Sequence, residues 1–131
     1  MRPLAAAALT SALVAAPGCS ADGPSCADAP ASVVEAAGFP AMFASASAIT
    51  GGDGAWFVGI PAELTSVRPE VAVFASAVDP ASGAFDGTLL PANELAEGTV
   101  GRPGGADAFA GSEGVLDATT CVRDRTEELS G

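Results

Sequence analysis

Two segments in the middle of the chain alternate apolar side chains with a period of two, which is typical of β-strands. In "AWFVGIPAEL" (55–64), one face consists of Trp56, Val58 and Ile60. In "EVAVFASAV" (70–78), one face consists of Val71, Val73, Ala75 and Ala77, and the other carries Phe74 and Val78. Because only "TSVRP" separates the two segments, we expect them to form an antiparallel pair. Pro61 predicts that its strand ends there or lies at a sheet edge.

The flanking segments indicate helices. "PAMFASASAI" (40–49) predicts a helix with Pro at its first position, and a strand is the alternative. Its helical face would consist of Met42, Phe43, Ala46 and Ile49. "TLLPANELAEGT" (88–99) indicates a short strand running into a helical turn around 92–96. Ser112 has the position of an N-cap before an apolar stripe made of Val115, Ala118, Thr119 and Val122.

Segments rich in Gly, Pro and Asp separate these elements, and we expect loops at 50–54, 79–87 and 101–111. The pattern predicts an α+β fold, with a short antiparallel sheet and two or three helices in one small domain. We place this domain at 33–125, after a disordered tether at 19–32 and before a frayed tail at 126–131.

The first residues have the features of a secretory signal peptide, which we place at 1–18. A short positive segment, "MRP", precedes the uncharged run "LAAAALTSALVAA" (4–16). A helix needs roughly 20 apolar residues to cross a bilayer, so this run is too short for a retained membrane anchor. The sequence therefore predicts export.

The end of this segment, "AAPGC", resembles the lipobox of bacterial lipoproteins, in which small residues precede a cysteine that is acylated after cleavage. Ala15, Ala16, Gly18 and Cys19 match that motif, whereas Pro17 stands where a small residue other than proline is usual. The resemblance implies lipid attachment at Cys19 and a cell-membrane anchor. Secretion without lipid is the alternative.

The chain has three cysteines, Cys19, Cys26 and Cys121, so an exported protein would keep one unpaired thiol unless one is modified. Lipidation of Cys19 leaves Cys26 and Cys121 as a pair for one disulfide, which oxidising compartments favour. Pairing of Cys19 with Cys26, leaving Cys121 free and buried, is an alternative, as is pairing of Cys19 with Cys121. The Cys26–Cys121 pair would enclose nearly the whole domain.

Charge and missing residue types restrict the possible functions. The formal net charge is −11, and the basic residues are five arginines: Arg2, Arg68, Arg102, Arg123 and Arg125. This balance argues against nucleic-acid binding and against electrostatic binding to anionic lipid. Because the chain has no His, Lys or Tyr, it lacks the usual bases, Schiff-base amines and phenolic acids of enzymes. We expect no catalytic residue and no cofactor.

Four local patterns have both a functional and a structural interpretation. "AGSEG" (110–114) has the outline of a nucleophile elbow, but Ser112 without a His is better explained as an N-cap. The loop between Asp79 and Asp86 contains carboxylates of the type that bind Ca²⁺, but it lacks EF-hand spacing and is better explained as a solvated turn. "GRPGG" (101–105) matches no phosphate-binding motif. Trp56 and Phe57 could form a binding platform. Because the chain has so few aromatic residues, packing in the core is the better explanation, at least for Trp56.

Several segments together resemble small predicted lipoproteins and secreted proteins of high-GC Gram-positive bacteria. The matching segments are "AWFVGIPAE", "VAVFASAVDP", "LLPANELAEGT" and the terminal "CVR". The resemblance implies export, anchoring and a compact α+β domain, and it implies no catalytic residue.

We therefore expect a membrane-tethered extracytoplasmic lipoprotein that acts as a non-enzymatic envelope accessory or interaction module. Its membrane contact would be the N-terminal lipid, and its protein partner is not specified by the sequence. The alternative is a lipoprotein that binds a small ligand or Ca²⁺ through the Asp79–Asp86 loop.

Overall fold

The structure is a computed structural model that describes residues 26–52, 55–66, 68–101, 104–109 and 111–130. The predicted signal peptide and Cys19 lie outside these residues. In chain order the elements are β2 (Ala27–Asp28), α2 (Ala31–Ala36), the 3₁₀ helix η2 (Ala41–Ala46), β3 (Ala48–Gly52), β4 (Ala55–Pro61), β5 (Val71–Ser76), β6 (Leu90–Pro91), α3 (Glu94–Val100), α4 (Ala106–Phe109) and α5 (Glu113–Ser130).

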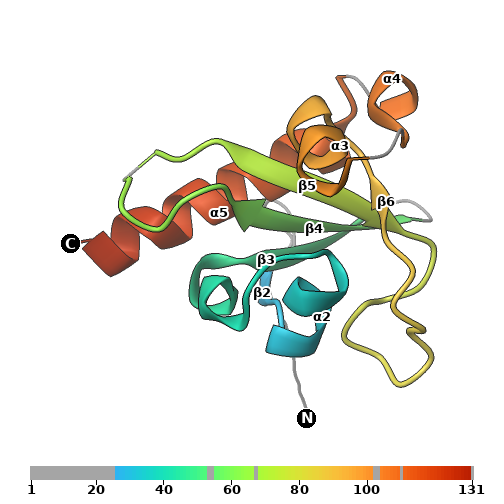
Figure 1. Ribbon diagram of the computed structural model, residues 1–131, viewed down its shortest axis with the longest axis horizontal. Coiled ribbons are helices and arrows are strands. Elements are labelled where there is room, and N and C mark those ends of the chain that lie inside the picture. Colours follow the sequence, from blue (N-terminus) through green and yellow to red (C-terminus); the bar gives the residue numbers. More distant parts are fainter. Residues whose placement is uncertain (1–25, 53–54, 67, 102–103, 110, 131) are drawn as a thin grey trace, which may run out of the picture.

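The five strands form one antiparallel sheet in the order β2-β3-β4-β5-β6 (Figure 1). The predicted antiparallel pair is β4 and β5, which pair from Trp56 opposite Ser76 to Pro61 opposite Val71. Of the two expectations for Pro61, the strand end is confirmed, since β4 ends there. The sheet edge is wrong, because β4 pairs with β3 on one side and β5 on the other. The α+β class with a small antiparallel sheet and helices is confirmed.

Helices cover both faces of the sheet: α5 crosses one face, and α2 and η2 lie against the other (Figure 1). Alternate residues of β5 contribute to two different cores, one on each face of the sheet. Ala72 and Phe74 belong to the core under α2. Val71, Val73 and Ala75 join the core under α5. Every residue of β5 is buried. The two-residue pattern thus separates two apolar faces rather than an apolar face from a solvated one.

Glycines allow α5 to approach the sheet closely. A Cβ atom added at Gly59 of β4 would lie 2.8 Å from Val122 Cγ2 and 3.0 Å from the Ala118 carbonyl oxygen. A Cβ atom added at Gly114 of α5 would lie 2.1 Å from Cε2 of Phe57. A glycine in one layer therefore lets its backbone lie directly against the other layer at each of these two points. The alanine-rich composition builds a core from short side chains in close contact rather than from large ones.

For segment 40–49 the sequence left a helix and a strand as alternatives, and the structure contains both. Pro40 directly precedes η2, and β3 begins at Ala48. Ser47 lies between them, and its hydroxyl donates to the Phe43 carbonyl oxygen at 2.8 Å. The expectation of one continuous helix is wrong because β3 pairs with β4 over its full length, and this pairing also includes Thr50–Gly52 of the expected loop.

The tether expected at 19–32 overlaps the folded domain. Ala27 and Asp28 pair with Ile49 and Ala48 of β3, and α2 starts at Ala31. Val33 and Val34 of α2 are fully buried. The small and polar residues of this segment gave no indication of β2, or of α2, whose first two residues lie at its end.

Asn93 joins β5 to α3. Its Oδ1 accepts hydrogen bonds from the backbone N–H groups of Val73 (3.2 Å) and Ala96 (2.9 Å). Its Nδ2 donates to the Val71 carbonyl oxygen at 2.8 Å. The side chain thus caps α3 and also continues the hydrogen bonding of β6 along β5, since β6 itself is only two residues long.

The remaining differences concern the C-terminal third. α4 lies within the expected loop 101–111. Oε2 of Glu97 accepts from the backbone N–H groups of Gly104, before this helix, and of Ala106, its first residue. α5 continues to Ser130, so the frayed tail expected at 126–131 is helical over 126–130. Thr126 is buried, and its hydroxyl donates to the Val122 carbonyl oxygen. The helix therefore continues beyond the apolar stripe that the sequence shows.

Two Gly→Ala substitutions in helices should have opposite effects on stability. Gly114→Ala places a methyl group against the Phe57 ring and should destabilise the protein by about 1–3 kcal/mol. Gly98→Ala in α3 meets no atom within 4 Å and should stabilise it by about 0.5–1 kcal/mol through helix propensity. Urea unfolding of both variants tests this. Equal stability of Gly114→Ala and the unsubstituted protein would contradict the close contact.

Candidate functional site

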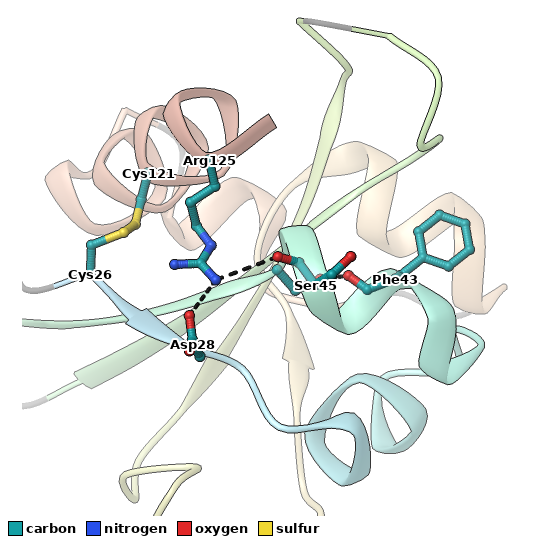
Figure 2. Close-up of polar contacts among 7 residues, drawn as sticks. Cys26, Asp28, Phe43, Ser45, Cys121 and Arg125 are labelled. Atoms are coloured by element: carbon teal, nitrogen blue, oxygen red, sulfur yellow. Dashed lines mark hydrogen bonds and ion pairs between the residues drawn. A yellow bond between two sulfur atoms is a disulfide. The ribbon is translucent and has the colours of Figure 1, made fainter. Parts of the chain in front are cut away.

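Cys26 and Cys121 form a disulfide that attaches the start of the described chain to α5 (Figure 2). Their Cα atoms are 6.1 Å apart, and 95 positions separate them in sequence. Cys121 is buried, whereas Cys26 is exposed. The predicted pairing is therefore present, and it leaves neither cysteine for a bond with Cys19.

An ion pair reinforces this attachment. Nη2 of Arg125 donates to Oδ1 of Asp28, and a long contact of 3.5 Å joins it to the Ser45 carbonyl oxygen (Figure 2). Four residues of helix rise about 6 Å, and two residues of strand extend about 6.6 Å. The pairs 26–121 and 28–125 therefore hold β2 alongside α5 at two matching points.

The two attachments differ in strength. The Asp28 side chain is 84% exposed and that of Arg125 is 21% exposed, so water screens the ion pair. Such pairs contribute about 0–1 kcal/mol. In the chain-entropy model, a disulfide that closes a loop of this length contributes about 4–5 kcal/mol. Of these two cross-links between β2 and α5, the disulfide therefore contributes more to the stability of the fold.

Asp79 and Asp86, the weak candidates for Ca²⁺ binding, each stabilise a turn. Oδ1 of Asp79 accepts from the Ala81 N–H at 2.9 Å, and Oδ1 of Asp86 accepts from the Thr88 N–H at 2.9 Å. The hydrogen bond from the Thr88 backbone lowers the pKa of the Asp86 carboxyl. Within the part of the chain that the structure describes, no three His, Cys, Asp or Glu side chains gather as a metal site would require.

The other sequence candidates have structural roles. Oγ of Ser112 accepts from the Val115 N–H at 3.3 Å at the start of α5, which confirms the N-cap. In the "GRPGG" segment, the Gly104 N–H donates to Glu97 and the Gly105 N–H donates to the Pro91 carbonyl oxygen, so these amides are already used.

Trp56 and Phe57 point to opposite faces of the sheet, so they form no common platform. Trp56 packs against the core under α2. Phe57 is buried in the core under α5. Trp56 is half-buried and packs against the core, as its interpretation as a packing residue expected.

The ring of Phe109, which sequence reasoning did not single out, lines several hollows on the surface of the described domain. On one side of this ring lies an open, mostly apolar depression of about 330 Å³, lined by Ala55, Ala75, Ala77 and Leu90. A more polar cavity of about 290 Å³ lies on another side and shares Ala55 with the depression. A lone aromatic residue in a glycine-rich segment was the only signal for this region.

The polar cavity lies at the N-terminal end of α5. Its wall includes the rings of Phe57 and Phe109, whose centroids are 5.6 Å apart in an edge-to-face arrangement. Ser112, Glu113 and Asp117 come from α5 and its cap, and Thr50 comes from β3. Two aromatic rings, two carboxyl groups and two hydroxyl groups therefore meet in one hollow.

Comparisons with protein-family models, with curated proteins and with solved structures give no match to this chain. None of the helices in the described ranges combines the length and the apolar composition that crossing a bilayer requires.

Loss of the disulfide should strongly destabilise the domain. We expect the double variant Cys26→Ser, Cys121→Ser to lose about 2–5 kcal/mol of unfolding free energy, because the open chain regains the entropy of a 95-residue loop. Thermal and urea unfolding, with and without reductant, measure this loss.

Asp28→Asn is the matched control, because it removes the charge of the ion pair and leaves the disulfide intact. Its cost should not exceed about 1 kcal/mol. The account is contradicted if reductant leaves the unfolding midpoint of the unsubstituted protein unchanged.

Proposed function

We propose that this chain is an exported lipoprotein that is anchored to the outer face of the cell membrane and acts as a non-enzymatic interaction module. The observation that carries the proposal is the Cys26–Cys121 disulfide. Such bonds belong to oxidising, extracytoplasmic compartments. The pairing also leaves Cys19, directly after "AAPG", as the one cysteine with no disulfide partner in this chain.

The position of the disulfide leaves only a short chain segment between the lipid at Cys19 and the folded domain. Cys26 follows Cys19 by seven positions. A fully extended segment of that length spans about 25 Å. A lipid at Cys19 would therefore keep the domain near the bilayer, with β2 and the second half of α5 nearest to it. The net charge of −11 disfavours electrostatic adhesion to anionic lipid, so the acyl chains would provide the attachment.

The residue chemistry supports binding rather than catalysis. The chain offers no His, Lys or Tyr, and Ser112 is engaged as a helix cap. The alternative, a Ca²⁺-binding or small-ligand lipoprotein using the Asp79–Asp86 loop, has weaker support. One oxygen of each carboxylate already accepts a backbone hydrogen bond within its own turn.

Lipid attachment is tested by expressing the full chain in a bacterium that processes lipoproteins. We expect the unsubstituted protein to sediment with membranes and to incorporate labelled palmitate. Cys19→Ala should do neither, because it lacks the thiol that forms the thioether. Ser20→Ala is the control for a change beside the processing site and should behave like the unsubstituted protein. Unlabelled, soluble wild-type protein would contradict the proposal.

A further inference from the structure

We propose that the polar cavity at the start of α5 binds an organic ammonium group, and that the adjoining apolar depression takes the apolar substituent of that cation. The ligand class is a small amphipathic amine. The inference goes beyond the proposed function, since it concerns the domain whether or not a lipid anchors it.

The aromatic wall favours a cation. The rings of Phe57 and Phe109 both line the cavity and lie edge to face. The face of an aromatic ring carries partial negative charge and attracts an ammonium group, and the attraction grows as water is excluded. Phe57 is buried and held against Gly114, so its ring is a fixed part of the wall.

The charges of the cavity have the matching sign. Glu113 and Asp117 are four residues apart in α5, so they lie on one side of the helix, and both line the cavity. A helix N-terminus carries about half a positive charge, which offsets only part of two carboxylates. None of the described arginines lines this cavity.

Two of those arginines have partners elsewhere. Nε of Arg123 donates to the Pro69 carbonyl oxygen, and Arg125 pairs with Asp28. The carboxylates of the cavity therefore have no described basic neighbour, and a cationic ligand would supply the missing countercharge.

Thr50 provides an independent observation. Its side chain is on the face of β3 that meets α5, it lines the cavity, and the residue is 1% exposed. Its Oγ1 is the only buried side-chain hydroxyl among the described residues that has no hydrogen-bond partner. A buried hydroxyl without a partner is costly, so the site gains when an N–H donor supplies one.

The adjoining depression selects an amphipathic cation over a bare metal ion. It shares Ala55 and Phe109 with the polar cavity, so one molecule can lie against both. Its remaining wall consists of alanine and leucine side chains with the hydroxyl-bearing Ser76 and Thr88, and it contains no carboxylate, the ligand that a bare divalent metal ion prefers. An alkyl or aryl group placed there buries apolar surface while the ammonium group faces the carboxylates.

The test is a titration of the ¹⁵N-labelled full chain with 2-phenylethylamine, followed by NMR. The neutral 2-phenylethanol and the anionic 3-phenylpropionate serve as probes of matched shape. We expect saturable shifts at the amides of Thr50, Ala55 and Gly114 with the amine. The alcohol should bind about tenfold more weakly, because it lacks the charge that the rings and carboxylates attract. The carboxylate should not bind.

Variants distinguish binding of the amine at this cavity from non-specific attraction of a cation to an acidic protein. Asp117→Asn and Phe109→Leu should each weaken binding of the amine several-fold, since one removes charge and the other removes the aromatic face. Asp124→Asn, an exposed position farther along α5, is the matched control and should bind as the unsubstituted protein does. Equal affinity of the Asp117 and Asp124 variants, equal affinity of amine and alcohol, or no saturable binding of the amine would each overturn the proposal.

Discussion

The disulfide between Cys26 and Cys121 is the constraint on which the described domain depends. It encloses a chain whose core is built largely from alanine and valine, and short side chains bury little apolar area each. A domain of this size has a small margin of stability. By closing a loop of 95 positions, the bond restricts the unfolded chain and holds β2 at the edge of the sheet.

The core compensates for its small side chains by close approach. α5 rests on the sheet at Gly59 and Gly114, where a side chain would collide with Val122 or Phe57. The same contact places Phe57 and the first turn of α5 at the rim of the hollow around Phe109. The close approach of α5 to the sheet therefore also shapes the surface that we propose as a ligand site.

The local sequence pattern was sufficient to predict the elements with strong periodicity. It failed for elements whose structure depends on contacts with distant parts of the chain. The pairing of β4 with β5, the cap at Ser112 and the cysteine pair followed from spacing and count. Segment 40–49 divides into η2 and β3 because pairing with β4 overrides the local preference for a helix. The short strand expected at the start of 88–99 is present as β6. β2 could not be predicted, since its pairing partner in β3, about 20 positions along the chain, defines it. The cavity around Phe109 assembles β3, β4, α4 and α5, which no sequence window contains.

The separate roles of the cysteines are the central claim, and intact mass of the membrane-extracted protein tests it most directly. The account predicts a chain that begins at Cys19 and carries a diacylglycerol adduct. It also predicts that reduction adds the mass of two hydrogen atoms, as one disulfide between Cys26 and Cys121 requires. A chain without lipid that begins at another residue, or a mass that reduction leaves unchanged, would contradict it.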